Sequence, residues 1–400
     1  MLIVRILRKI YKIPKAGIYT LLLTILFIYC SISKRKNINN NENNEKSILF
    51  IAGFGKYGGT RTYVEDLLAK LEKNNYKIHI IFNKNNINAE GLNLIKSEKM
   101  KYNIYNYSFN NLFYMLVSIT YFYKLINKKN INTTIISEGD CGYYIPCILL
   151  KTQNILIEHT IPGKIDRYRQ RMINKIKSNS KIVCVSNFQK NVIIENWGKH
   201  LINYCSVVYN SSSYNSAFLI KNKFNTKKKK IITVAHFIYY KNPDMWLSIA
   251  RKLTEKYSEL EFIWIGDGDE LMSYKNIIGE NNAIKLLGYC NHDQIKEEYE
   301  NAFLYLALSK IESLGIAVID ALYAGLPAIV LNTGGLPEVV DSEKCGYVVN
   351  SEDEAIEKIE VLLKDEELYQ NMKRSALERY NMLFTKEEWE KNIISLIGCV

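Results

Sequence analysis

The chain has 400 residues, of which 48% are apolar and 24% charged, enough for two domains that each bury their own core. Six prolines and 20 glycines exclude collagen-like and low-complexity chains, and the eight cysteines show neither a C-x-x-C pair nor metal-ligand spacing with histidine, which argues against a disulfide scaffold or a structural zinc site. The net charge of +12 is concentrated, because residues 1–36 hold eight basic residues and no acidic one. A nucleic-acid binder spreads its basic residues more widely, so this pattern excludes that class of partner.

An apolar stretch lies between the basic residues of this N-terminal segment. Residues 17–33 read GIYTLLLTILFIYCSIS, and a helix of this length spans roughly 25 Å, near the lower limit for crossing a bilayer. We therefore expect residues 1–36 to associate with a membrane, as a spanning helix or as a helix lying in the interface. A cleaved signal peptide and a buried helix of a soluble protein remain as alternatives. Residues 37–46 are rich in asparagine and are expected to form a tether.

From residue 47 onward, short apolar runs of strand length alternate with helical stretches. In the first half of the chain, the runs are 48–52, 78–82, 133–137, 155–157, 182–185 and 207–209. Alternation of this kind predicts a parallel sheet covered by helices on both faces. Residues 111–126 are aromatic and apolar, and we expect a buried helix there, with membrane contact at its edge as the alternative.

The pattern restarts after the lysine run 227–230, which we interpret as a linker. The later runs are 231–235, 261–265, 284–287, 303–308, 328–331 and 347–349. The sequence thus predicts an α/β protein with two doubly wound, Rossmann-like domains, at 47–226 and 227–384, that face a central cleft. Within 385–400, a last helix is expected to follow an N-cap at Thr385 and to pack back towards the N-terminal domain.

Two loops carry residues suited to binding an anion. The loop that contains Gly58 and Gly59 joins a strand to a helix, where backbone N–H groups and the helix dipole favour negative charge. Its spacing matches neither a P-loop nor G-x-G-x-x-G, so an ordinary turn remains the alternative. Lys241 follows the first strand of the second domain and would point into the cleft, where its ammonium would stabilise a departing phosphate. The alternative for Lys241 is a solvated loop residue.

Two acidic residues, Glu312 and Asp320, lie eight residues apart around Gly315. Eight residues correspond to 2.2 turns of helix, so both carboxylates would face one ligand if Gly315 opens the helix. A carboxylate accepts hydrogen bonds from both members of a vicinal diol, so the pair suits a sugar and a ribose. A solvated pair is the alternative.

The sequence around these acids resembles a known family. Residues 312–335 read ESLGIAVIDALYAGLPAIVLNTGG, and LPE follows. This phrase is similar to the family 4 retaining glycosyltransferases of the GT-B fold, whose signature is an E-x7-E element, an A-x-G-x-P-V strand entry and G-G-x-P-E. The resemblance extends from about residue 47 to 397 and is stronger in the second domain. It implies transfer of a sugar from a nucleotide-sugar to an acceptor hydroxyl with retention, without a metal ion or a further cofactor.

The resemblance also implies roles for single residues. Glu312 would hold hydroxyls of the donor sugar, Asp320 the ribose diol, and Lys241 the diphosphate. His159, after a strand of the first domain, would lie beside the transferred sugar, unless it is a structural histidine. The other donor-binding candidates are Gly58, Gly59, Arg61, His236, Gly288, Tyr289, Ser313, Leu314, Gly315 and Ile316, with Gly288 and Tyr289 at the base pocket.

Two departures from the family pattern affect the predicted site. Asp320 stands where the family has glutamate and is one methylene shorter. His236 stands where the family usually has arginine, so a phosphate charge partner is lost unless the imidazole is protonated. As a hypothesis, Arg61 replaces that charge from across the cleft.

The resulting interpretation is a membrane-associated glycosyltransferase with its catalytic domains in the cytoplasm. Its acceptor would be a glycan or a lipid-linked molecule of bacterial surface polysaccharide synthesis. Two alternatives stay open: a GT-B enzyme that hydrolyses or epimerises a nucleotide-sugar, and a catalytically weakened scaffold subunit of a glycan assembly complex. A lumenal eukaryotic enzyme also stays open, because Asn106, Asn132 and Asn210 lie in N-x-S/T patterns.

Overall fold

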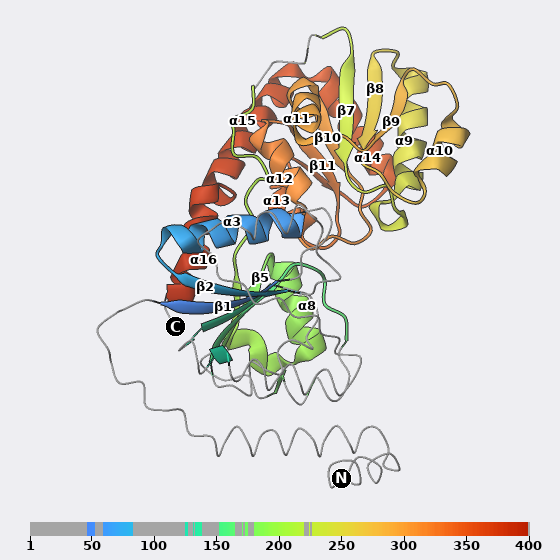
Figure 1. Cartoon of the computed structure of the whole chain (residues 1–400). Coiled ribbons are helices and arrows are strands. Elements are labelled where there is room, and N and C mark those ends of the chain that lie inside the picture. The colour runs from blue at the N-terminus through green and yellow to red at the C-terminus, as the bar shows by residue number, and fades with distance from the viewer. Residues whose placement is uncertain are drawn as a thin grey trace, which may run out of the picture.

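The protein folds into two α/β domains, which Figure 1 shows one above the other. This computed structural model describes residues 46–52, 59–82, 125–126, 131, 133–137, 152–164, 170, 173–174, 180–219, 224 and 226–398. Each domain contains a six-stranded sheet whose paired strands run parallel. The predicted pair of Rossmann-like domains is therefore confirmed.

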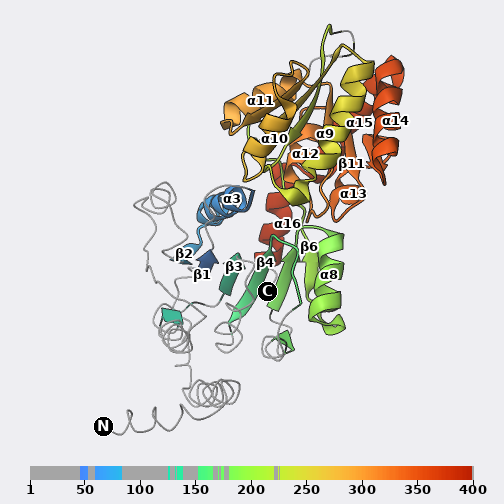
Figure 2. The ribbon, with the colours of Figure 1, turned by 90° about the vertical axis from the view of Figure 1, so that its right-hand side faces the viewer.

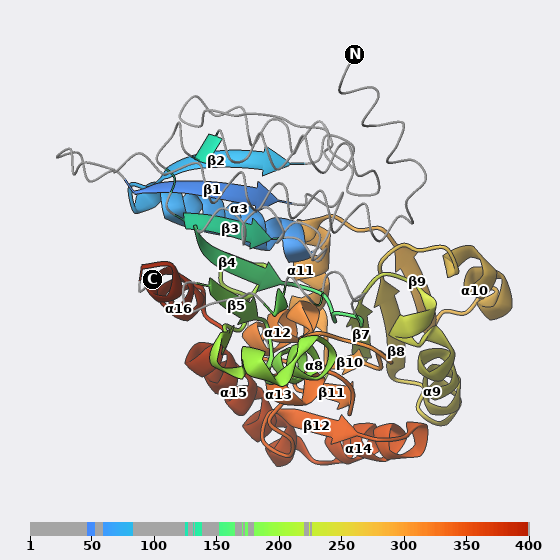
Figure 3. The ribbon, with the colours of Figure 1, turned by 90° about the horizontal axis from the view of Figure 1, so that it is seen from below.

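The N-terminal sheet has the strand order β2-β1-β3-β4-β5-β6, and Figure 3 shows its first strands side by side. Its strands are β1 (Ser47–Ala52), β2 (Lys77–Phe82), β3 (Thr133–Ser137), β4 (Gln153–Glu158), β5 (Ser180–Cys184) and β6 (Cys205–Val207). Helix α3 (Gly59–Lys73) contributes to the core on one face, and helix α8 (Asn187–Trp197) to the core on the other. Isoleucine and valine dominate these strands, as expected for strands buried on both faces.

The C-terminal sheet has the order β12-β11-β10-β7-β8-β9. Its strands are β7 (Lys229–Val234), β8 (Leu260–Ile265), β9 (Ile284–Gly288), β10 (Leu304–Ala307), β11 (Ala328–Leu331) and β12 (Gly346–Val349). Its helices are α9 (Pro243–Lys256), α10 (Leu271–Ile278), α11 (His292–Asn301), α12 (Ile316–Tyr323), α13 (Leu336–Val339), α14 (Glu352–Lys364) and α15 (Glu366–Leu383). Two apolar clusters, one on each face of the sheet, form its core.

The strand order of the C-terminal sheet reverses between β7 and β10, which are neighbours in space. The loops after these two strands therefore diverge to opposite faces and leave room between them. Open parallel sheets bind their ligands at this point. The loops after β7 and β10 carry Lys241 and Glu312, so the fold brings together residues that are 71 positions apart.

Helix α16 (Lys386–Gly398) returns to the N-terminal domain, as Figures 1 and 2 show. Trp389, Ile393 and Ile397 join the same core as α3 and β1. The Lys386 ammonium lies 2.6 Å from the Asp66 carboxylate of α3. Thr385 Oγ1 accepts a hydrogen bond from the backbone N–H of Glu388 at 3.2 Å, as predicted for an N-cap. The chain therefore passes between the domains twice, before β7 and before α16.

Some predicted boundaries were wrong by a few residues. The run 207–209 predicts a strand, but β6 ends at Val207, because only Cys205–Val207 pair with β5. The lysine run 227–230 is a linker only in its first half. Lys229 and Lys230 belong to β7, where they pair with Leu260 and Glu261. Their side chains reach solvent at the end of the strand, so their charge did not exclude a strand.

The predicted N-terminal hydrophobic helix in 1–36 and nearly all of the tether at 37–46 lie outside the described residues, as does most of the predicted helix at 111–126. Its last two residues, Leu125 and Ile126, are described and buried. Among the helices that the structure describes, none is both long enough and apolar enough to cross a membrane.

Candidate functional site

The centre of the site is an ion pair between Lys241 and Glu312. Lys241 ends a short 3-10 turn, Tyr239–Lys241, in the loop after β7. Glu312 lies in the loop between β10 and α12, and the two loops are also joined by a hydrogen bond from Lys310 N–H to the Tyr240 carbonyl at 2.8 Å. The Lys241 and Glu312 side chains remain 18% and 19% exposed, so both are accessible to a ligand.

Two glycines fix the path of the chain at Glu312. The segment Gly334–Gly335 runs against the backbone of Glu312 and Ser313, and Gly335 N–H donates to the Glu312 carbonyl at 3.0 Å. A Cβ at Gly334 would lie 1.9 Å from the Glu312 carbonyl oxygen, and one at Gly335 would lie 2.3 Å from the Ser313 carbonyl oxygen. The G-G pair thus permits a backbone contact that places the Glu312 side chain beside Lys241.

Replacing Gly334 with alanine is expected to displace Glu312 and to lower kcat/KM for the donor by at least ~10-fold, with a loss of about 2–3 kcal/mol in the free energy of unfolding. Gly279 offers a control for a positive φ without a clash, because its φ is +64° and a Cβ there meets nothing within 4 Å. Gly279→Ala carries the backbone strain alone. Steady-state kinetics and urea unfolding of both variants test this prediction. An equal loss of kcat/KM in Gly334→Ala and Gly279→Ala would contradict it.

Helix α12 begins directly after the Glu312 loop. Gly315 precedes its first residue, Ile316, with a φ of +102°, and this left-handed conformation suits glycine. Glu312 thus precedes the helix, whereas Asp320 lies within it. The two acids therefore do not lie on one helix, and the expectation that both carboxylates face one ligand stays a prediction. The backbone N–H groups of Ile316 and its neighbours are at the positive end of the helix.

Asp320 is buried and bound to the segment that links the domains. One carboxylate oxygen accepts hydrogen bonds from Ser212 Oγ at 2.6 Å and Ser213 N–H at 2.8 Å, and the other accepts from Ser213 Oγ at 2.5 Å. Burial raises the pKa of Asp320, and the bonds from the two serines lower it in part. To bind a ribose diol as predicted, Asp320 would have to give up hydrogen bonds to the serines and accept hydrogen bonds from the ribose hydroxyls instead. The serine donors come from the three-serine run 211–213, which lies more than 100 positions before Asp320 in the sequence.

The other predicted residues of the C-terminal domain lie along the same edge of its sheet. His236 is exposed in the loop after β7, and the Ala235 carbonyl oxygen before it lies against Gly266, where a Cβ would come within 1.9 Å of that oxygen. Gly288 ends β9 with a φ of +76°, and Tyr289 after it is 72% exposed. Leu314 is buried. Contacts of these residues with a donor stay predictions.

His159 meets the Glu312 loop from the N-terminal domain. It follows β4, and its carbonyl accepts a hydrogen bond from Ser313 Oγ at 3.0 Å. Its Nε2 lies 2.8 Å from Ser137 Oγ, and its ring packs edge-on against Tyr63 with 4.7 Å between centroids. Burial lowers the pKa of His159 to about 4, so its imidazole is neutral at pH 7.

The low pKa of His159 predicts a loss of stability in acid. The unfolded chain binds this proton near pH 6.5 and the folded chain only near pH 4, so the free energy of unfolding should fall across that window and level off below it. Because His159 as a whole is only half-buried, about 3 kcal/mol is an upper bound for the effect. Urea unfolding from pH 7 to 4 should show a smaller fall for His159→Gln. Parallel curves for the two proteins would contradict the prediction.

The residues predicted after β1 are only partly described. Gly59 is the first residue of α3, whereas Gly58 and the Arg61 side chain lie outside the described positions. The hypothesis that Arg61 replaces the charge lost at His236 therefore stays a prediction. Within the described part of the chain, no group of three or more His, Cys, Asp or Glu residues could hold a metal ion.

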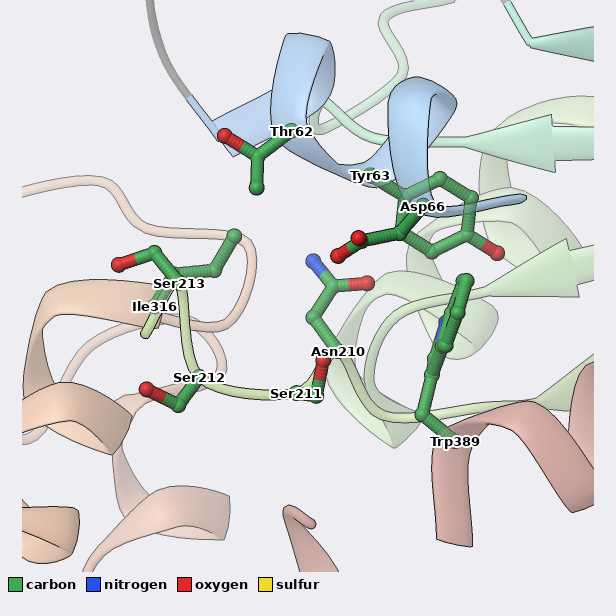
Figure 4. Close-up of a pocket in the computed structure, with 9 residues that line it drawn as sticks. All are labelled: Thr62, Tyr63, Asp66, Asn210, Ser211, Ser212, Ser213, Ile316 and Trp389. Atoms are coloured by element: carbon green, nitrogen blue, oxygen red, sulfur yellow. The ribbon is translucent and has the colours of Figure 1, made fainter. Parts of the chain in front are cut away.

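A hollow of about 290 Å³, which includes solvent at its open side, lies between the domains (Figure 4). Its lining comes from α3, the interdomain segment, α12 and α16 and consists of Thr62, Tyr63, Asp66, Asn210, Ser211, Ser212, Ser213, Ile316 and Trp389. Ile316 is the one predicted site residue in this lining. The hollow therefore adjoins the first residue of α12.

Comparison with known proteins gives the family. Residues 216–379 match the family Glycosyl transferases group 1. An uncharacterized glycosyltransferase of Haemophilus influenzae is 25% identical over 361 residues, which are 85% of this chain and 98% of that protein. The matched residues place the C-terminal domain in the group 1 glycosyltransferases. Enzymes of this family transfer a sugar from a nucleotide-sugar with retention and use no metal ion, and the Lys241–Glu312 pair lies within the matched region.

Solved structures show that this glycosyltransferase has the GT-B fold. A crystal structure of Anabaena HepE in complex with UDP superposes with a TM-score of 0.72 at 15% identity and covers 88% of this chain and all of that one. The apo form of the lipopolysaccharide outer core galactosyltransferase WaaB superposes with a TM-score of 0.69 at 14% identity and covers 88% of this chain and 99% of that one. At these identities the likeness establishes the fold alone.

Proposed function

We propose that this glycosyltransferase uses a UDP-sugar and transfers the sugar to a hydroxyl of a lipid-linked or surface-glycan acceptor in a bacterium. The observation that carries the donor half of the proposal is the accessible Lys241–Glu312 pair at the switch point of the C-terminal sheet. An ammonium suits a diphosphate, and a carboxylate accepts hydrogen bonds from sugar hydroxyls. UDP as the nucleotide is supported by the UDP in the HepE crystal structure.

The residues present account for the chemistry of transfer. Cleavage of the bond between sugar and diphosphate leaves an oxocarbenium-like sugar and adds negative charge to the nucleotide. Lys241 and the N-terminal amides of α12 stabilise that charge most strongly at the transition state, which is how a binding group raises kcat. A phosphate oxygen of the departing nucleotide takes the proton of the acceptor hydroxyl on the same face, so this route needs no carboxylate nucleophile.

The acceptor half of the proposal rests on the N-terminal sequence. The basic and apolar segment 1–36 would keep the enzyme at a membrane, where lipid-linked acceptors lie. The catalytic domains would face the cytoplasm, because nucleotide-sugars are made there. The fold shared with WaaB, whose name is that of a lipopolysaccharide galactosyltransferase, supports the same class of acceptor.

Titration calorimetry of the full chain with UDP, GDP and ADP tests the donor. We expect UDP to bind most tightly and a matching UDP-sugar to raise the melting temperature by mass action. Failure of all three nucleotides to bind would favour the scaffold subunit, and rapid donor turnover without any acceptor would favour a hydrolase or epimerase. Flotation with vesicles that contain anionic lipid tests the membrane segment, and a chain that stays in the soluble fraction would contradict that part.

A further inference from the structure

We propose that Glu338 is a positioning residue that couples closure of the two domains to assembly of the donor site. It follows the Gly334–Gly335 segment, in helix α13 of the C-terminal domain, yet its carboxylate binds the N-terminal domain. The expected effect of Glu338 on kcat rests on the proposed function. The contact between Glu338 and the N-terminal domain does not depend on which sugar is transferred.

The Glu338 carboxylate accepts four hydrogen bonds, three of them from the start of α8 in the N-terminal domain. One oxygen accepts from the Phe188 N–H at 2.6 Å. The other accepts from Asn187 N–H at 2.7 Å, from Asn187 Nδ2 at 3.0 Å and from the Tyr209 hydroxyl at 3.1 Å. The three donors of Asn187 and Phe188 belong to α8 of the other domain, so their bonds to Glu338 exist only while the domains are together. Tyr209 lies in the segment that joins the domains, and its ring packs against the C-terminal core.

The physical reason for this contact is the start of α8. The first N–H groups of a helix have no partner within it and form its positive end. Ser186 caps the Gln189 N–H, and the first turn of α8 contains no acidic residue. Glu338 supplies from the other domain the acceptors and the negative charge that the first two N–H groups need. Charged hydrogen bonds of this kind are stronger than neutral ones.

Glu338 also belongs to a ring of contacts that includes the donor site. Ser186 Oγ donates to the Ser313 carbonyl at 2.6 Å, so the start of α8 contacts the Glu312–Ser313 loop as well. That loop is joined back to the Glu338 segment through Gly335 N–H and the Glu312 carbonyl. The start of α8 therefore contacts both the Glu312–Ser313 loop and helix α13, and Figure 2 shows α8 directly below α13.

The ring has rigid supports on both sides. In the C-terminal domain, Arg379 of α15 donates to the Glu338 carbonyl at 2.9 Å. In the N-terminal domain, Gln189 Nε2 donates to the Thr160 carbonyl at 2.7 Å, directly after His159. Parting of the domains must break the bonds from α8 to Glu338 together with the bonds that Ser313 makes to Ser186 and His159. Closure on Glu338 thus brings His159 to the Glu312 loop in the same movement.

Kinetics and nucleotide binding of Glu338 variants test this inference. We expect Glu338→Ala to lower kcat by roughly 10- to 100-fold, the range that loss of charged hydrogen bonds corresponds to, while its dissociation constant for UDP changes by less than about threefold. Glu338→Gln keeps an acceptor of the same length and should be intermediate. Small-angle X-ray scattering of the protein saturated with UDP should show Glu338→Ala to be more extended than the unchanged protein.

A matched control and a double variant complete the test. Glu280→Gln removes the same charge from an exposed position of the C-terminal domain and should behave as the unchanged protein. Tyr209→Phe removes one of the four bonds and should add nothing when combined with Glu338→Ala. Unchanged kcat and scattering in Glu338→Ala would overturn the inference, as would a loss explained by a lower melting temperature. If the unchanged protein binds no UDP, the proposed function fails, and scattering without ligand still decides on the Glu338 contact.

Discussion

Replacing Lys241 with alanine is expected to slow sugar transfer by about 10²–10³-fold. Lys241 is the cation that the structure places beside Glu312 at the switch point, and its charge opposes the negative charge that develops on the departing diphosphate. The loss should appear mainly in kcat, since that charge is larger in the transition state than in the bound donor. The rate of UDP release from the UDP-sugar that the protein binds measures this loss of turnover.

Lys310 provides the control for Lys241. It lies on the neighbouring loop, and its ammonium lies 3.6 Å from the centroid of the exposed Tyr239 ring. Lys310→Ala therefore removes a lysine close to Lys241 but leaves the Lys241–Glu312 ion pair intact. Its turnover should remain within about threefold of the unchanged protein. Equal losses in the two variants would show a general effect of surface charge and would contradict the assigned role of Lys241.

For Glu312, the other member of the ion pair, we expect the opposite effect on UDP binding. Glu312→Gln removes the partner that shares the Lys241 ammonium, so UDP, which has no sugar, should bind as tightly as before or more tightly. Turnover should still fall, because the donor sugar loses a charged acceptor for its hydroxyls. Calorimetry with UDP separates the variants: weaker binding in Lys241→Ala, and no weaker binding in Glu312→Gln. Weaker UDP binding in both would contradict this division of roles.

The two sheets were predictable from sequence because parallel strands buried on both faces are continuous runs of apolar residues. The run at 48–52, for example, is β1, whose described side chains from Ile48 to Ile51 are fully buried. The end of β6 and the start of β7 were predicted less well. At both places the strand continues or stops according to its pairing with a neighbour, and the side chains alone do not record that pairing.

The site was predictable where its residues follow strands of one sheet. Lys241 and Glu312 follow β7 and β10, and the strand order of a doubly wound sheet brings such loops together. The contacts of Asp320 and Glu338 were not predictable in this way. Their partners, Ser212 and Asn187, belong to other parts of the chain and meet them only through the relative placement of the domains. No local spacing encodes that placement.

Asp320→Ala is expected to lower the free energy of unfolding by about 2–4 kcal/mol. The variant would leave a cavity and would remove the acceptor from two serine side chains and the Ser213 N–H in a buried environment. For a chain of this size the melting temperature should fall by several degrees. Because Ser212 and Ser213 belong to the segment that joins the domains, the loss should also loosen the domain interface.

Two further variants separate charge from geometry at Asp320. Burial raises the pKa of Asp320, so the ionised form is itself costly there, and neutral Asp320→Asn should lose much less stability than Asp320→Ala. Asp320→Glu restores the family's residue but adds a methylene at a position only 5% exposed, and should cost about 1–3 kcal/mol. Urea unfolding measures all three. A glutamate variant as stable as the unchanged protein would contradict the tight packing of Asp320 against the two serines.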